Sequence, residues 1–246
     1  MLIAGLLIFV PIHLLLRLVR IGSSMPRLYL AYATWVAGAR VRTVGKPLRR
    51  DVVFLANHVS WIDIPAIAGC TGSAFVSKAE LRDAPVVGWL STLNRTVFVA
   101  REDRMGVAEQ IERLREALAE TWAVTIFPES TVNDGRSLLP FKPSLLAVLD
   151  PPPPGLVVQP VLLDFGADSF DIAWIGEETG VNNALRVLAR SGSFPLAIHF
   201  LEPFDPAALD GRKAITARAR AAIEDALAKV MGGPVPVYAG HAQWTN

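Results

Sequence analysis

From Pro47 onward, short apolar runs alternate with stretches of helical period, and this alternation limits the possible fold more than any other feature of the chain. The runs are apolar almost without a break, which is typical of strands that are buried on both faces. We therefore predict an α/β domain with a mixed, largely buried β-sheet flanked by helices. Strands are predicted at 51–57, 73–78, 96–100, 123–127, 156–165 and 195–201, and helices at about 61–70, 84–92, 103–120, 142–150 and 206–230.

An apolar N-terminal region precedes this pattern. Leu2–Leu16 is interrupted in polarity only by His13, and as a helix it would reach about 22 Å, short of the ~30 Å hydrocarbon core of a bilayer. A second apolar segment, 26–42, begins with Pro26, a favoured residue at a helix start. We expect an amphipathic or apolar helical hairpin that lies in, or dips into, one leaflet.

This interpretation divides the chain into a membrane-associated hairpin at 1–46 and an α/β domain at 47–246. A hairpin buried against the α/β domain is the alternative, because Pro11 and the short runs also suit a core. A cleaved signal peptide is disfavoured, since the charges follow the apolar run and no A-x-A cleavage pattern comes after it.

Charge is distributed unevenly along the chain. The first fifty residues contain eight Lys or Arg and no acidic residue, whereas the other 196 contain all 23 acidic residues and 16 bases. Bases interspersed with aliphatic runs favour an anionic membrane surface over nucleic acid as a partner. Cys70 is the single cysteine, which excludes an intrachain disulfide and fits a reducing compartment. We expect the protein at the cytoplasmic face of the inner (plasma) membrane.

The stretch NHVSWID places His58 and Asp63 at the end of an apolar strand. A spacing of five does not put two side chains on one helix face. If His58 precedes a helix and Asp63 lies in its first turns, however, the carboxylate can reach back to the imidazole. The pair would then act as a general base, with the nucleophile supplied by the substrate. The simpler alternative is structural: His58 hydrogen-bonds a backbone carbonyl, and Asp63 caps the helix.

Three further features occur at strands, in a fixed order. Arg101 follows the strand VFVA, and Glu129, Ser130 and Thr131 follow the strand AVTIF. Pro160 lies inside the strand VVQPV, where it removes a ladder hydrogen bond and predicts an edge or a bulge. Each is weak evidence by itself, but together they point to one site at the strand ends.

These four stretches resemble, in order, the conserved blocks of the PlsC-like glycerolipid acyltransferases, which include the 1-acyl-glycerol-3-phosphate acyltransferases. The resemblance covers about residues 50–165 and extends to the segment 77–90 between the first two blocks. The matching residues are Asn57, His58, Asp63, Lys78, Arg101, Phe127, Pro128, Glu129, Thr131 and Pro160.

The resemblance implies an O-acyltransferase with His58 and Asp63 as its general base pair. It also implies that Arg101 binds an acceptor phosphate. Two departures from the family pattern are Ser130 in place of a glycine and Val132 in place of a basic residue; Arg136 and Lys142 are candidates for the missing charge. The substrate-binding residues that the resemblance suggests are Arg101, Glu129, Ser130, Thr131, Lys78 and Asn57.

The activity implied is transfer of a fatty acyl group from acyl-CoA or acyl carrier protein to the free hydroxyl of a lysolipid. The first expectation for the acceptor is 1-acyl-glycerol-3-phosphate, which gives phosphatidic acid, and the alternative is lyso-ornithine lipid. The thioester is a co-substrate, so no cofactor is expected.

Other classes fit the sequence less well. An acyl-thioester hydrolase would use similar residues, but the chain has no G-x-S-x-G, and Ser60 is too close to His58 in sequence to face its ring. A non-enzymatic membrane-binding protein would leave the four ordered motifs unexplained. No metal is expected, because the histidines are scattered and no H-E-x-x-H occurs. His199, inside a strand, is interpreted as a satisfied core histidine.

Overall fold

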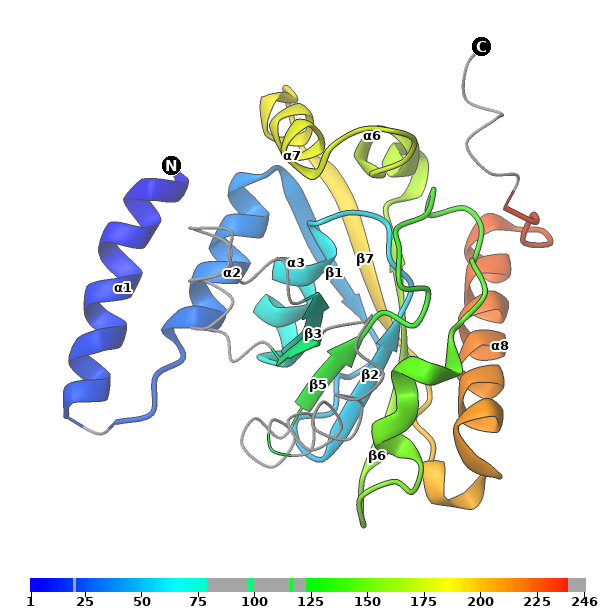
Figure 1. Ribbon diagram of the computed structural model, residues 1–246. Coiled ribbons are helices and arrows are strands. Elements are labelled where there is room, and N and C mark those ends of the chain that lie inside the picture. The colour runs from blue at the N-terminus through cyan, green and yellow to red at the C-terminus, as the bar shows by residue number, and fades with distance from the viewer. Residues whose placement is uncertain (20, 79–96, 100–115, 117–122, 239–246) are drawn as a thin grey trace.

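In the computed structural model, residues 1–19, 21–78, 97–99, 116 and 123–238 are described. Within them the strands form one sheet, in the spatial order β1-β7-β6-β2-β5-β3-β4. β6 and β7 are antiparallel, whereas the other neighbours are parallel, so the predicted mixed α/β architecture is confirmed (Figure 1). The strands are β1 Ala39–Val44, β2 Val52–Ala56, β3 Ala74–Lys78, β4 Val97–Val99, β5 Ala123–Ile126, β6 Val157–Asp164 and β7 Phe194–Phe200.

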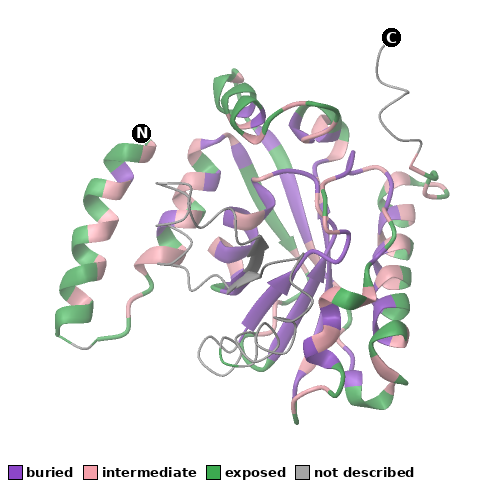
Figure 2. Cartoon of the chain, viewed as in Figure 1, coloured by how far each residue is buried: buried purple, intermediate pink, exposed green. Residues whose placement is uncertain are grey.

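The centre of the sheet is buried on both faces, as the unbroken apolar runs predict (Figure 2). In β2 the side chains of Val52 and Phe54 belong to one core cluster, and those of Val53 and Leu55 belong to the cluster on the opposite face. Helix α3 packs on the first face, and α8 covers the second (Figure 1). The strand order places β2 between β5 and β6, so the segments that follow β2 and β5 emerge side by side.

The helices agree with the sequence pattern in part. The predicted helix 61–70 corresponds to α3 and 206–230 to α8, each of which ends one residue later, and 142–150 forms the 3-10 helix η2 instead of an α-helix. The predicted helix 84–92 lies outside the described residues, as does 103–120 apart from Glu116. The elements outside the sheet are α1 Leu2–Leu18, α2 Met25–Val36, α3 Asp63–Thr71, η2 Pro143–Leu149, η3 Gly166–Asp168, α6 Ser169–Ile172, α7 Gly180–Ala189, η4 Pro206–Ala208 and α8 Gly211–Met231.

Strand β1 was not expected from the sequence. The second apolar segment was predicted to continue to residue 42, but α2 ends at Val36 and Gly38 turns the chain with φ +97°. β1 then pairs with β7 at the edge of the sheet. Its Arg40 and Arg42 are exposed, which is usual for an edge strand. The other strands were predicted from unbroken apolar runs, and β1 has no such run. Residues N-terminal to the predicted boundary at 46 therefore join the sheet.

The two N-terminal helices form the predicted hairpin. Gly5 of α1 lets Tyr29 and Tyr32 of α2 approach closely, and a Cβ added at Gly5 would lie 2.5 Å from the ring of Tyr32. α2 in turn packs on α3, where Gly69 would clash with the backbone of Ala31 if it carried a Cβ. Among the described helices, none is long and apolar enough to cross a bilayer.

Pro160 lies in an interior strand, so the prediction of an edge position is wrong and that of a bulge is correct. Val161 pairs with Phe200, whereas Val158 bridges to Phe204, so the chain that continues from β7 has one extra residue across this interval. The carbonyl of Pro160 accepts from the backbone N–H of Leu201 on the same side. A proline is tolerated here because the ladder is already interrupted where its missing N–H would have donated.

Candidate functional site

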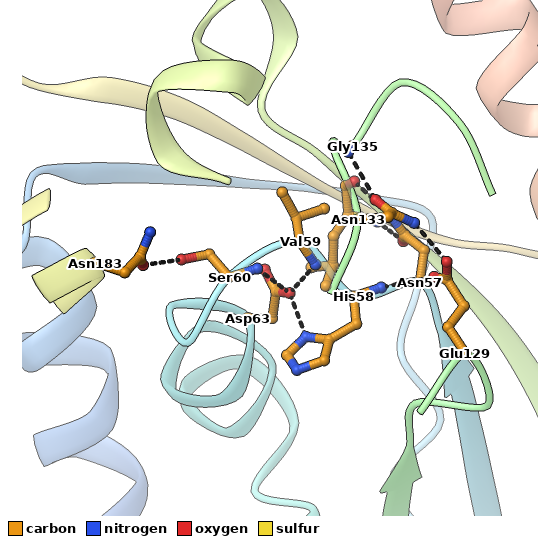
Figure 3. A network of polar contacts seen from close by, with 10 residues as sticks. Asn57, His58, Val59, Ser60, Asp63, Glu129, Asn133, Gly135 and Asn183 are labelled. Atoms are coloured by element: carbon orange, nitrogen blue, oxygen red, sulfur yellow. Dashed lines mark hydrogen bonds and ion pairs between the residues drawn. The ribbon is translucent and has the colours of Figure 1, made fainter. Parts of the chain in front are cut away.

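The geometry predicted for His58 and Asp63 is present. α3 begins at Asp63, and the carboxylate Oδ2 lies 2.7 Å from Nδ1 of His58 in the preceding loop. The same oxygen accepts the backbone N–H groups of Val59, at 2.6 Å, and Ser60, at 2.9 Å (Figure 3). Asp63 is completely buried. Because this oxygen already accepts two backbone N–H groups, the geometry suits the tautomer in which Nδ1–H of the imidazole is the third donor.

The second ring nitrogen of His58 is left for another partner. Within the described residues Nε2 makes no hydrogen bond, and in Figure 3 it points away from the polar network. The ring stacks on Phe127 with 4.2 Å between centroids and an interplanar angle of 16°, and Phe127 stacks on Phe75. The imidazole is thus held at its edge by Asp63 and on one face by Phe127. It is a base with one lone pair available and little freedom to rotate.

Glu129 holds the backbone of His58. It follows β5, the strand beside β2, and its Oε1 accepts the N–H of His58 at 2.9 Å. Its Oε2 accepts from the side chain of Asn133 and from the N–H of Leu139. The carbonyl of His58 accepts the N–H of Asn133 at 2.7 Å. Both polar groups of the His58 backbone are therefore tied to the segment that follows β5 (Figure 3).

Burial dominates the electrostatics of Glu129. The side chain is 1% exposed, and burial raises its pKa to about 8, more than the hydrogen bonds from Leu139, His58 and Asn133 lower it. The charge of the nearby Asp63 raises it further. The two carboxyl groups beside His58 therefore differ in environment. Asp63 accepts three hydrogen bonds at one oxygen, whereas Glu129 accepts hydrogen bonds at both of its oxygens.

Asn57 uses its side chain as a substitute for sheet pairing. Its amide Nδ2 donates to the carbonyl of Leu163 at 3.1 Å, and its Oδ1 accepts the N–H of the same residue at 2.7 Å. The side chain is completely buried against β6. Like Glu129, it is occupied by protein groups, which favours a role in fixing the loop; the substrate-binding role stays a prediction for both.

The structure describes only some of the other residues that were predicted to bind substrate. Ser130 is half-buried with φ +64°, a left-handed backbone, and Thr131 is exposed next to it. Glycine adopts this conformation without strain, which is consistent with the glycine of the family pattern that Ser130 replaces. Lys78 is the last residue of β3, but its side chain lies outside what the structure describes, and Arg101 lies outside the described residues altogether. Their predicted roles are untested.

Three residues that contact the site were not identified from the sequence. Phe127 was noted only as part of a motif, and Asn133 lies in a turn-like NDG stretch. The third, Asn183 on α7, receives a hydrogen bond from the hydroxyl of Ser60 at 3.3 Å. The N-cap of α7 could have revealed that helix, because the Thr179 side chain accepts the N–H of Asn182.

His199 corrects another expectation. The ring packs in β7 as predicted, but its Nε2 is buried and has no hydrogen-bond partner among the described residues. Burial lowers the pKa of His199, so the neutral ring is favoured. It is a core histidine that is not satisfied. In the described part of the chain, no group of three or more His, Cys, Asp or Glu side chains is placed to hold a metal ion.

The raised pKa of Glu129 predicts a pH-dependent contribution to stability. Between its ordinary value of 4.5 and about 8, the folded chain binds more protons at this group than the unfolded chain, so stability falls as pH rises. Glu129→Gln removes this titration. The wild-type unfolding free energy, relative to that of the variant, should decrease by up to about 1.4 kcal/mol per pH unit across this interval. Urea unfolding of both proteins measures the difference, and a flat or rising difference contradicts the prediction.

The left-handed backbone at Ser130 predicts a difference between two substitutions. Ser130→Gly and Ser130→Ala both remove the hydroxyl, but only alanine keeps a Cβ in the disfavoured conformation. The glycine variant should therefore be more stable, by about 1 kcal/mol. Chemical denaturation of the two variants side by side tests this. Equal stabilities, or a more stable alanine variant, would show that the left-handed backbone is not strained here.

Comparison with known proteins places this geometry in a family. Residues 40–164 match the family described as Acyltransferase. The chain is 30% identical to the lyso-ornithine lipid O-acyltransferase of Rhodobacter capsulatus, over 78% of this chain and 71% of that protein. It is 33% identical to the protein of the same name from Pseudomonas aeruginosa, over 83% and 79% of the two chains. Lysophosphatidylcholine acyltransferase 1 of Rattus norvegicus is 30% identical over 83% of this chain and 38% of that protein.

The fold has a counterpart among solved structures. The 1-acyl-sn-glycerophosphate (LPA) acyltransferase PlsC from Thermotoga maritima superposes with a TM-score of 0.66 and covers 93% of this chain, at 22% identity. At that identity the match shows the fold alone. Together with the family match over the strands and loops that build the His58 site, these findings show that the chain belongs to the acyltransferase family.

Proposed function

We propose that this acyltransferase transfers a fatty acyl group from a thioester, acyl-CoA or acyl carrier protein, to the free hydroxyl of a lysolipid. The observation that carries the proposal is the 2.7 Å pairing of His58 Nδ1 with the buried Asp63 carboxylate. When Nδ1 donates to Asp63 from the neutral ring, Nε2 carries the lone pair, and it has no partner among the described residues. A neutral imidazole held in this way is suited to remove a proton from an alcohol.

In the proposed step, Nε2 of His58 accepts the proton of the acceptor hydroxyl as the hydroxyl oxygen attacks the thioester carbonyl carbon. The new C–O bond forms, the C–S bond breaks, and the leaving thiolate takes the proton back from the imidazolium. The Asp63 carboxylate stabilises the imidazolium in between, which it does strongly because it is buried. No protein nucleophile takes part.

The environment of Ser60 weighs against the hydrolase alternative. A serine hydrolase would need this hydroxyl next to Nε2, but Ser60 is completely buried and its hydroxyl donates to Asn183. In Figure 3 the side chain points away from the imidazole. Acyl transfer by direct attack of the acceptor is therefore favoured over an acyl-enzyme.

For the acceptor we propose lyso-ornithine lipid in preference to 1-acyl-glycerol-3-phosphate, the first expectation from the sequence. Relatives from several bacteria that carry the name lyso-ornithine lipid O-acyltransferase match most of this chain. An amino-acid head group does not need the basic residue that Val132 replaces. The roles proposed for Arg101, Lys78 and Thr131 are contacts with the acceptor head group or the acyl donor.

We also propose that the hairpin of α1 and α2 holds the enzyme on an anionic membrane surface, at the cytoplasmic face of the inner membrane. Large apolar side chains cover the outside of α1, for example Ile3, Leu7 and Leu18, which are 73–80% exposed. Exposure of so large an apolar surface to water is unfavourable, whereas its insertion at the boundary of a bilayer is favourable. The acceptor, itself a lipid, would reach the site from the same surface.

The general-base assignment predicts the effect of two substitutions. His58→Ala removes the base and should lower kcat by about 10²–10⁴-fold or more, and Asp63→Asn should have a similar effect because its amide cannot accept the three N–H donors in the same way. Acyl-CoA turnover with a lysolipid acceptor measures both. His199→Ala is the matched control and should keep wild-type turnover. Appreciable activity in a folded His58→Ala variant contradicts the assignment.

The acceptor proposal predicts a specificity ratio. With one donor, purified enzyme should show a higher kcat/KM for lyso-ornithine lipid than for 1-acyl-glycerol-3-phosphate, and acyl transfer should exceed acyl release to water. Product analysis by mass spectrometry separates the three outcomes. A preference for 1-acyl-glycerol-3-phosphate would restore the first expectation, and release to water as the main reaction would favour the hydrolase.

A further inference from the structure

Helix α7 carries an apolar stripe on its exposed side. Val181, Leu185 and Leu188 are 69%, 61% and 40% exposed, and their spacings of four and three put them on one line along the helix. The buried side of the same helix has the apolar Val187 and the polar Asn183. In a surface helix of a protein surrounded by water the larger apolar stripe faces the core, whereas here three large apolar side chains face outward. We call these three residues the α7 stripe.

Helix α7 lies at the same end of the molecule as the start of α1 and the end of α2 (Figure 1). Phe194, just after the turn that follows α7, donates its N–H to the carbonyl of Gly38 at 3.0 Å, directly after α2. Trp35, near the end of α2, is 49% exposed. One helical turn earlier, the hydroxyl of Tyr32 donates to the carbonyl of Met1, the residue before α1. The start of β7, which follows α7 in the chain, is therefore bonded to the segment that follows α2.

Most charges next to α7 are paired with one another. α7 itself has no acidic residue, and Arg186 binds Glu178 while Arg190 binds Asp168 and Asp171; Glu177, before the helix, is exposed. The exposed Arg40 lies over the ring of Trp35, 5.4 Å from its centroid, at the junction between α2 and the sheet. A tryptophan with an adjacent arginine is typical of groups that lie at the level of lipid head groups. Apolar side chains flanked in this way match the boundary of an anionic bilayer better than a protein surface.

We propose that the α7 stripe is a second bilayer contact, which inserts beside the hairpin when the enzyme lies on an anionic membrane. The inference rests on the proposed function, because it takes the hairpin as the first contact. It adds a consequence for the site. Asn183, on the inner side of α7, holds the hydroxyl of Ser60, whose N–H is bound to the Asp63 carboxylate. The helix that touches the bilayer thus supports the loop of His58 from behind, and this fixes the orientation of the loop relative to the membrane.

A fluorescent label on the stripe tests the proposal directly. Cys70→Ala removes the single thiol from the full chain, and Leu185→Cys then accepts an environment-sensitive NBD label. When vesicles of phosphatidylglycerol and phosphatidylcholine are added, the emission should shift to shorter wavelength and gain intensity, and lipids with brominated acyl chains should quench it. The same label at Leu7→Cys on α1 reports the hairpin, and at Asp225→Cys, exposed on α8, it reports a site that should stay in water.

The pattern of responses separates the possible failures. A response at Leu7 without one at Leu185 overturns the inference and leaves the hairpin and the catalytic proposal intact. No response at either position overturns both membrane contacts, while acyl transfer to detergent-dispersed lysolipid still tests the enzymatic function by itself. A change at Leu185 that appears without vesicles as protein concentration rises, with a doubled mass in sedimentation, means that a second copy covers the stripe and also overturns the inference.

Substitution of the stripe provides a second measurement. Leu185→Gln combined with Leu188→Gln should weaken partition onto the same vesicles by about tenfold or more, because two apolar side chains no longer leave water. Val230→Gln is the matched control, since Val230 is 41% exposed on α8. Both proteins should keep wild-type activity on detergent-dispersed substrate. Unchanged partition of the double variant contradicts the proposal.

Discussion

The buried carboxylate of Asp63 is the interaction on which the site depends. A fully buried charge is costly unless nearby donors compensate for the water it loses. Here a single oxygen accepts from the imidazole of His58 and from two backbone N–H groups of the same loop. The position of Asp63 at the start of α3 adds the favourable end of the helix dipole. The conformation of the loop between β2 and α3 brings these donors to Oδ2 and orients the imidazole, whereas Oδ1 is buried with no hydrogen-bond partner among the described residues.

A second carboxyl group secures the loop from the other side. Because β5 lies beside β2, Glu129 reaches the backbone N–H of His58, and Asn133 reaches its carbonyl. Asn57 joins the same loop to β6 through two hydrogen bonds to Leu163. Neighbouring strands on both sides of β2 therefore fix the loop. Removing any of these groups would leave buried donors or acceptors unpaired, which is costly in a low-dielectric interior.

Sequence reasoning succeeded where the physical cause is local. The strand before Asn57 and the helical period after Trp61 placed His58 outside the helix and Asp63 in its first turn, and the structure has this arrangement. It failed where tertiary contacts override local pattern. The edge strand β1 is stabilised by pairing with β7, which lies more than 150 residues away, and its exposed arginines resemble a surface segment. α7 was missed because its helical period lies on the exposed side.

By itself, the sequence determined that the chain forms a largely buried sheet flanked by helices and that a His and an Asp meet at the end of one strand, because unbroken apolar runs and helix starts are properties of neighbouring residues. Only the tertiary structure decided what the other polar residues do. The His58 loop is held by Glu129, Asn57 and Asn183, which come from distant parts of the chain. These residues reach the loop only because β2 lies between β5 and β6 and because α7 packs behind the loop. Strand order and helix packing arise from the burial of the whole core, so no short stretch of sequence contains them.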